Sequence, residues 1–215
     1  MTMLTRRRAV HLAGLAAAAS LLPAAPGHAA LPPDKLVYVR KVEAYLNGIH
    51  TLQAKFSQVS PDGGSATGKV YIDRDKPGMR FVYDPPVKID LIAPGDWRLV
   101  FMDGQAKQQN VLPVKDTPLG FLLNKQVSLS GDLDVTDVAL ERGEILITVT
   151  RTKAPDQGRV VIAFVERPLE FRRWMVTDPQ GMQTVVILEN VQLNKPIDQQ
   201  LFVYRDPKIF GWPNS

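Results

Sequence analysis

The chain has 215 residues, 45% of them hydrophobic, and a formal net charge of +4 at neutral pH. It contains no cysteine, which excludes disulfide bonds, thiol catalysis and thiolate metal sites. Arg6, Arg7 and Arg8 are the only charged residues among the first 29, so the rest of the chain carries a net charge of only +1. A domain with so little charge has no bulk electrostatic attraction for nucleic acid, and we expect no nucleic-acid partner.

Residues 1–29 have the pattern of an export signal. The three arginines precede an apolar run from Ala9 to Leu22 that is too short to span a membrane, and small residues follow it up to Ala29. We predict cleavage after Ala29, which leaves residues 30–215 as one soluble domain in the periplasm. The paired arginines also suit the twin-arginine route, although the next two residues depart from its usual Phe-Leu, so both export routes stay open.

The first predicted element of the mature chain is an amphipathic helix over residues 33–50. Apolar residues recur there at spacings of three and four, from Leu36 through Val42 to Ile49. From Leu52 the period changes to two, which predicts a strand. A helix is therefore expected to lead directly into a sheet.

The central stretch, residues 68–92, contains three short alternating runs separated by Pro-rich turns. Met79, Phe81 and Tyr83 share one face of the middle run, and Arg80 lies on the other. Such alternation is typical of antiparallel strands with one face on a core and one toward water. The stretch predicts a meander whose apolar side carries large residues.

The remaining strands follow at regular spacing, with turn residues between them. This pattern predicts a mainly β (α+β) domain with short helices, built as an antiparallel sandwich or barrel. The pattern alone does not separate a filled core from a sheet that curls around a ligand cavity, and both interpretations stay open. We expect strands over residues 97–102, 107–112, 135–140, 145–151, 158–166, 170–177 and 183–192.

A very apolar segment interrupts the strands at residues 116–124. Asp116 or Thr117 can cap a short helix there, and Pro118 suits its first position. A helix that is apolar on nearly all sides has to be covered, so it is either a plug in the core or a lid over a cavity. Its apolar residues are Leu119, Phe121, Leu122 and Leu123.

Candidates for catalysis or metal binding are few. His50 is the only histidine after the signal, and we interpret it as a surface residue at a helix end. The acidic run of Asp132, Asp134 and Asp137 lacks the Gly and terminal Glu of a calcium loop and is interpreted as a solvated turn. The sequence contains neither a nucleophile elbow nor a phosphate loop. It therefore predicts no catalytic residue, metal or cofactor, and it favours a binding protein over an enzyme.

Several motifs together resemble the periplasmic lipoprotein carrier family LolA, in its alphaproteobacterial form. They are Leu52-x-Ala54-x-Phe56-x-Gln58, residues 68–86, residues 117–123, Pro168-Leu169-Glu170 with Trp174-x-Val176-x-Asp178-x-x-Gly181, and Phe202-x-Tyr204-x-Asp206-Pro207. The resemblance covers nearly all of the mature chain. It implies an incomplete antiparallel β-barrel, covered by a helical lid, that encloses a hydrophobic cavity.

The resemblance also implies a function and partners. A carrier of this family is a monomeric chaperone that takes acylated lipoproteins from an inner-membrane ABC-type release complex and carries them to the outer membrane. An outer-membrane receptor is a further expected partner. That receptor is itself a lipoprotein, so the absence of cysteine argues against the receptor role for this chain. Competing interpretations are a carrier of another lipid, and a lipid-sensing or protein-binding module on the same fold.

Within the family, a basic residue before a Pro-Gly turn helps to hold the lid. Lys76 directly precedes Pro77, whereas counting from Gly68 favours Arg74, so both residues are candidates for this contact. Met79, Met102 and Met175 would suit the soft, irregular packing of a cavity lining, and ordinary core positions stay open for each of them. The residues expected to line the cavity or its lid are Phe56, Met79, Phe81, Tyr83, Ile89, Leu91, Leu99, Phe101, Leu119, Phe121, Leu122 and Leu123.

The size of an acyl chain sets a limit on how such a carrier works. Burial of one methylene contributes roughly 0.8 kcal/mol, so a chain of about 15 methylenes contributes on the order of 12 kcal/mol. Full burial of two or three chains would make release very slow. A carrier must therefore bind incompletely or use part of the binding energy to open its own lid. We expect the free protein to be closed.

Overall fold

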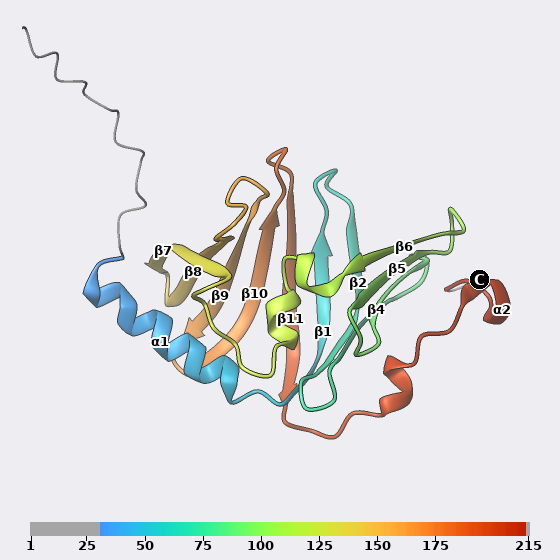
Figure 1. Cartoon of the computed structure of the whole chain (residues 1–215), viewed down its shortest axis with the longest axis horizontal. Coiled ribbons are helices and arrows are strands. Elements are labelled where there is room, and N and C mark those ends of the chain that lie inside the picture. The colour runs from blue at the N-terminus through green and yellow to red at the C-terminus, as the bar shows by residue number, and fades with distance from the viewer. Residues whose placement is uncertain (1–30, 214–215) are drawn as a thin grey trace, which may run out of the picture.

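The computed structural model describes residues 31–213, and the predicted export signal with its cleavage site lies outside them. A single sheet of eleven strands dominates this part of the chain, and every neighbouring pair in it is antiparallel (Figure 1). The strands are β1 (Thr51–Val59), β2 (Ser65–Asp73), β3 (Gly78–Tyr83), β4 (Ile89–Ala93), β5 (Arg98–Asp103), β6 (Gln108–Pro113), β7 (Leu133–Glu141), β8 (Glu144–Arg151), β9 (Arg159–Glu166), β10 (Leu169–Thr177) and β11 (Gln183–Leu193).

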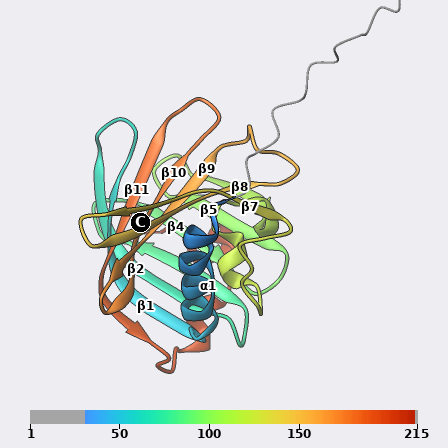
Figure 2. The same ribbon diagram turned by 90° about the vertical axis from the view of Figure 1, so that its left-hand side faces the viewer.

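The sheet consists of two meanders joined in the middle. Their order is β6-β5-β4-β3-β2-β1-β11-β10-β9-β8-β7, so the first and last strands of the chain pair with each other. The two edge strands, β6 and β7, are consecutive in sequence and are linked by residues 114–132. The sheet is strongly curved but open, which confirms the predicted mainly β fold with an incomplete barrel (Figures 1 and 2).

Helix α1 (Pro33–Asn47) lies in the hollow of the curved sheet (Figure 2). Its side chains Val39, Val42 and Leu46 are buried, as the spacing predicts, whereas Leu36 is exposed. The helix ends earlier than the predicted residue 50, because the N–H of Gly48 closes the last turn and β1 begins three residues later. No helix within residues 31–213 is long and apolar enough to cross a membrane.

The main core lies on the concave face and joins the two meanders. Phe81 of β3 contacts Phe56 of β1 at a ring-centroid distance of 5.4 Å and Trp174 of β10 at 6.0 Å, both edge to face. Edge-to-face pairs contribute beyond the area that they bury. This chain of rings therefore ties the first half of the sheet to the second across its curvature.

A second, smaller core lies on the convex face, under the C-terminal segment. It contains Ile92, Val100 and Met102, with Tyr204 packed against them. The C-terminal segment carries the short helices η3 (Gln199–Phe202) and α2 (Pro207–Phe210). Met102 and Met175, which would suit soft packing in a cavity lining or in an ordinary core, do not face the concave core. Met102 belongs to the small core on the convex face. Met175 lies on the convex side as well, because its neighbour Trp174 points to the concave core and side chains alternate along a strand.

The apolar segment between β6 and β7 does not form the predicted helix over residues 116–124. It forms two short 3-10 helices, η1 (Val114–Asp116) and η2 (Gly120–Leu123). The hydroxyl of Thr117 donates to the carbonyl of Val114 at 2.7 Å, so it closes η1 and does not cap a following helix. Pro118 lies between the two turns. Runs this short suit 3-10 geometry better than an α-helix, whose nucleation needs several ordered residues.

Candidate functional site

We call residues 114–132 the cover segment, because they pass over the concave face between the two edge strands (Figure 1). The apolar side chains of this segment belong to the same core as the concave face of the sheet. They fill the interior from the side of the cover segment, and the side chains of the strands fill it from the side of the sheet. The buried members are Phe121, Leu122, Leu123, Val127 and Leu129.

A small cavity lies beneath the cover segment. Its volume of about 20 Å³ is close to that which a single water needs. An acyl chain does not fit this cavity unless the cover segment or the side chains around it move. The residues around this cavity are Leu46, Ile49, Leu52, Ile72, Arg74, Leu122, Val127 and Phe171.

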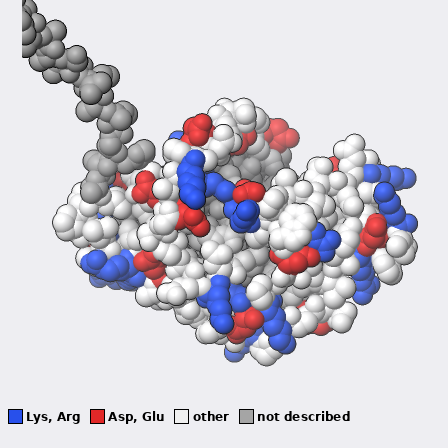
Figure 3. All heavy atoms as spheres, viewed as in Figure 1, with Lys and Arg blue, Asp and Glu red and all other residues white. Residues whose placement is uncertain are grey.

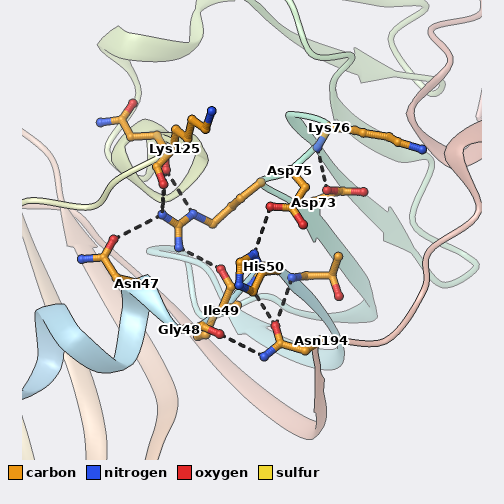
Figure 4. A network of polar contacts seen from close by, with 12 residues as sticks. Asn47, Gly48, Ile49, His50, Asp73, Asp75, Lys76, Lys125 and Asn194 are labelled. Atoms are coloured by element: carbon orange, nitrogen blue, oxygen red, sulfur yellow. Dashed lines mark hydrogen bonds and ion pairs between the residues drawn. The ribbon is translucent and has the colours of Figure 1, made fainter.

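The guanidinium of Arg74 connects three parts of the molecule just beyond the end of β2. It donates to the carbonyls of Leu46 and Ile49 at the end of α1, at 2.6 and 2.8 Å. It also donates to the carbonyls of Asn124 and Lys125 in the cover segment, at 2.8 and 2.9 Å. The labelled Ile49 and Lys125 converge on this point from opposite sides in Figure 4.

Arg74 is only 6% exposed, although it is charged. Burial lowers the pKa of its guanidinium from the usual value, and the nearby Asp75 carboxylate partly offsets this. The planar fork of five donors matches several carbonyls at once, which an ammonium does not. The carbonyls at the end of α1 also carry the negative end of the helix dipole. Neutral acceptors thus hold this buried cation in a geometry specific to arginine.

Lys76, the other candidate cation, is placed differently. It is exposed, and its backbone N–H, at 2.9 Å from the Asp73 carboxylate, shapes the turn between β2 and β3. The count from Gly68 along the strand therefore identifies the bridging cation better than adjacency to Pro77 does.

The predicted lining residues lie where their strand register puts them. Eight of the twelve are buried in the concave core or the cover: Phe56, Met79, Phe81, Tyr83, Leu99, Phe121, Leu122 and Leu123. Ile89, Leu91 and Leu119 are half-buried and pack against that core. Phe101 is the exception. It pairs with Leu91 on the concave side but is half-exposed and lies outside the core cluster, toward the rim formed by β6.

Two polar residues of α1, which the sequence alone did not single out, hold the cover segment. The side chain of Asn47 donates to the carbonyl of Val127 at 2.9 Å and accepts from its N–H at 2.8 Å. The carboxylate of Glu43 accepts from the N–H of Leu129 at 2.7 Å. Their spacing of four places them on one side of the helix. In the sequence they look like an ordinary solvated face, so no signal distinguished them.

The remaining polar candidates stay at the surface. Nδ1 of His50 lies 3.0 Å from the Asp75 carboxylate, and both side chains are exposed. Asp137 pairs with Lys35 at 2.9 Å, and this pair lowers the pKa of the Asp137 carboxyl. Between residues 31 and 213, no group of His, Asp and Glu side chains is arranged to hold a metal ion. Cationic and anionic side chains are interspersed over the face viewed in Figure 3.

A larger hollow of about 450 Å³ lies elsewhere, around the loops at one end of β8 to β11. Asp156, Arg159, Thr177 and Asp178 contribute to its walls. Because its lining is polar and it is open to solvent, it does not suit an acyl chain. The concave core under the cover segment is the better candidate for an apolar ligand.

Comparisons with solved structures give remote similarities. A LolA superfamily protein from Nitrosomonas europaea is 10% identical, with a TM-score of 0.41 over 77% of this chain and 97% of that chain. The lipoprotein LppX from Mycobacterium tuberculosis is 9% identical, with a TM-score of 0.44 over 78% and 99%. The Pseudomonas aeruginosa MucA/MucB complex contains a chain that is 14% identical, with a TM-score of 0.45 over 80% and 61%.

No curated protein matches the sequence. The decisive comparison is with a family described as outer membrane lipoprotein carrier protein LolA, whose sequence model matches residues 47–205. The match includes the sheet from β1 to β11, Arg74 and the whole cover segment. This chain therefore belongs to the LolA family of outer membrane lipoprotein carrier proteins.

Proposed function

We propose that this protein binds the acyl chains of lipoproteins released from the inner membrane and carries them through the periplasm to the outer membrane. Membership of a carrier family supports the proposal. The structural feature that supports this function most strongly is the closed cover segment, whose buried apolar side chains occupy the concave face.

The cover segment gives the binding a natural limit. Burial of its five apolar side chains contributes on the order of 10 kcal/mol, at about 1.5–3 kcal/mol each. That is comparable with the roughly 12 kcal/mol gained by one acyl chain of about 15 methylenes. A bound acyl chain replaces these side chains on the concave face, so most of its gain is offset. Cargo is therefore held reversibly, as delivery requires.

In this proposal, Arg74 holds the closed state. Its bonds to Asn124 and Lys125 have to break before the cover segment leaves the concave face. Its bonds to Leu46 and Ile49 lie outside the moving part and keep the guanidinium in place. Lys76 has no such role and acts as a surface cation in the turn.

A binding experiment with a fluorescent triacylated lipopeptide tests the proposal. The mature protein should bind it and should not bind the same peptide without acyl chains. Two isosteric variants provide a matched pair. Val70→Thr puts a hydroxyl into the concave core, whereas Val100→Thr puts one into the convex core, and both side chains are almost fully buried.

Both variants should lose similar stability, because each buries an unpaired hydroxyl at a cost of about 1–3 kcal/mol. Only Val70→Thr should weaken lipopeptide binding, by roughly tenfold. Equal effects of the two variants would contradict a binding site on the concave face. Binding of free phospholipid or sterol in preference to the lipopeptide would favour a carrier of another lipid.

A transfer experiment tests the proposed partners. Inner-membrane vesicles that contain an ABC-type release complex should pass a labelled lipoprotein to this protein in the presence of ATP. Outer membranes should then take the lipoprotein from the loaded carrier. Release without the carrier, or a carrier that keeps its cargo in the presence of outer membranes, would contradict the proposed route.

A further inference from the structure

Helix α1 is fastened to the sheet on one side and to the cover segment on another. On the sheet side, the N–H of Phe171 donates to the Tyr45 hydroxyl at 3.1 Å, and Lys35 pairs with Asp137 at 2.9 Å. Val39, Val42 and Leu46 of the helix are buried in the concave core. The two polar contacts lie near opposite ends of the helix, and neither involves the cover segment.

On the cover side, the contacts are of another kind. The amide of Asn47 binds both polar groups of one residue, the N–H and the carbonyl of Val127. The Glu43 carboxylate accepts a hydrogen bond from the N–H of Leu129, two residues after Val127. Val127 and Leu129 each have only 2% of their surface exposed, so these bonds are made at the edge of the core. The polar contacts between α1 and this stretch all go to the backbone of the stretch.

Both ends of the cover segment are attached to the end of β8. Arg151 donates to the carbonyls of Lys115 and Thr117 at 2.6 and 3.3 Å. Thr152, the next residue, binds the carbonyls of Gly131 and Asp132 at 2.7 and 3.1 Å. The two ends of the segment are thus pinned side by side, while its middle, residues 118–130, is held by α1 and Arg74.

From this arrangement we infer that α1 stays in place as a fixed post, while residues 118–130 move away from it as one unit. We call a side chain whose hydrogen bonds hold this unit against α1 a latch. Arg74 is the first latch and Asn47 is the second. The inference rests on the proposed function in one respect, since acyl uptake is the reason for the movement. Glu43 is a positioning residue that extends the same latch by one helical turn. The two residues differ in chemistry, because Arg74 offers a charged fork mainly to carbonyls and Asn47 offers a neutral amide to the peptide groups of Val127. They also touch each other, since Nη2 of Arg74 donates to Oδ1 of Asn47 at 3.4 Å (Figure 4).

The attachment at β8 makes the movement a hinged one. Gly131, at one end, has a φ of 85°, and a Cβ at Gly120 would lie 2.1 Å from the carbonyl oxygen of Val114. A side chain at Gly120 would clash with the backbone of η1, and Gly131 has a backbone conformation that residues with a side chain rarely adopt. When the middle swings out, Arg74 keeps its two carbonyl partners on the α1 side, so the post and the first latch stay organised for closure.

Amide hydrogen exchange tests the inference without any ligand. The amides of Val127, Leu129 and Phe171 report on the two fastenings directly, because their partners are Asn47, Glu43 and Tyr45. In the mature protein, Asn47→Ala should speed exchange at both Val127 and Leu129 by about tenfold and leave Phe171 within about twofold. Lys41→Ala, at an exposed position of α1, is the control and should change none of the three.

The amide of Leu129 is the informative one, since its own partner Glu43 is intact in Asn47→Ala. An effect at Val127 alone would show only a lost hydrogen bond and would overturn the idea of a unit. A parallel rise at Phe171 would show that α1 leaves with the cover segment, and would overturn the fixed post. Asn47→Asp keeps the acceptor for the Val127 N–H and should give a smaller rise at both positions.

Crosslinking provides the second test, and the absence of native cysteine makes it clean. The pair Asn47→Cys and Val127→Cys joins α1 to the cover segment, and the pair Lys35→Cys and Asp137→Cys joins α1 to β7. Each pair is closed with the same short thiol crosslinker, and uptake of a fluorescent long-chain fatty acid is measured. The first crosslink should reduce uptake by at least about tenfold and the second should leave it unchanged.

The outcomes separate this inference from the proposed function. Loss of uptake with the second crosslink, or full uptake with the first, would overturn the fixed post and the moving cover. If the protein with unlinked cysteines takes up neither the fatty acid nor a triacylated lipopeptide, the proposed function fails. In that case the exchange rates at Val127, Leu129 and Phe171 still decide how the segment moves.

Discussion

The guanidinium of Arg74 donates to the carbonyl of Asn124 through both Nε and Nη2, at 3.0 and 2.8 Å. Residues 50 positions apart in the sequence are thereby joined at the point where β2, α1 and the cover segment meet. The bond is directed at the backbone, so it depends on the course of the cover segment and not on its side chains. This contact gives the closed state a defined geometry.

Replacing Arg74 should therefore loosen the cover segment. Arg74→Ala leaves several buried carbonyls without donors, and each costs about 1–3 kcal/mol, so we expect a loss of roughly 3–5 kcal/mol in the free energy of unfolding. Arg74→Lys keeps the charge but loses the fork, and should lose about half as much. Chemical denaturation measures the loss, and increased fluorescence of a hydrophobic dye reports exposure of the concave core.

Lys76→Ala is the control for these variants, because Lys76 is exposed in the same turn. It should change the free energy of unfolding by no more than about 0.5 kcal/mol and leave dye binding unchanged. A larger effect of Lys76→Ala than of Arg74→Ala would reverse the assignment of the latch.

Gly68 is needed where two strands pack against an aromatic ring. A Cβ at this position would lie 2.2 Å from the carbonyl oxygen of Val82 and 2.7 Å from the ring of Phe56. Gly68→Ala should therefore lower the free energy of unfolding by about 3 kcal/mol, the upper end of the range for overpacking, because a backbone atom cannot move aside. Lys69→Ala, at the exposed neighbouring position, should have little effect in the same denaturation experiment.

On the convex face, Arg80 and Asp90 form a two-pronged pair, with distances of 3.1 and 2.6 Å. Asp90 is buried, and Arg80 also donates to the carbonyl of Leu201 in the C-terminal segment at 3.0 Å. Asp90→Ala leaves the arginine without its counter-charge and should cost about 2–4 kcal/mol. The double variant Arg80→Met, Asp90→Ala should cost less than the sum of Arg80→Met and Asp90→Ala measured singly, as a double-mutant cycle will show.

Alkaline pH should destabilise the protein through Tyr83. Burial raises the pKa of its hydroxyl to about 12, while the hydrogen bond to Gln58 acts in the opposite direction. The folded state thus holds its proton more tightly than the unfolded state. The contribution of Tyr83 is fully present below pH 10 and is lost as the pH rises from about 10 to 12, to a total of roughly 2–3 kcal/mol.

Urea denaturation at pH 9 and at pH 11.5 measures this loss in the native protein and in Tyr83→Phe. The variant should lose less stability between the two pH values, although it gives up the 2.8 Å bond to Gln58 at both. An identical loss in the two proteins would mean that Tyr83 is not the group responsible.

The sequence predicted the sheet well, because its signals are local. The alternation of Met79, Phe81 and Tyr83 persists in β3, and each expected strand is present within a few residues. The methionines show the limit of this reasoning. Met102 and Met175 are apolar residues in strands, but the pleat directs them to the convex face, and only the register of the whole sheet determines which face is the concave one.

The candidate site was predictable in its apolar part and not in its polar part. Burial of Phe121, Leu122 and Leu123 follows from their hydrophobicity, whatever the local helix type. The partners of Arg74, Asn47 and Glu43 are backbone atoms far away in the chain. A backbone carbonyl has no sequence signature, so residues that recognise a segment by its main chain are identified only once the fold brings the two together.

Mass spectrometry of the lipids and lipopeptides that copurify with the mature protein from its own periplasm tests the central claim most directly. The account predicts acylated lipoproteins, bound in the native protein and depleted in Val70→Thr. A protein that is consistently empty, under conditions that preserve weak complexes, would contradict a carrier and favour a filled-core module on the same fold.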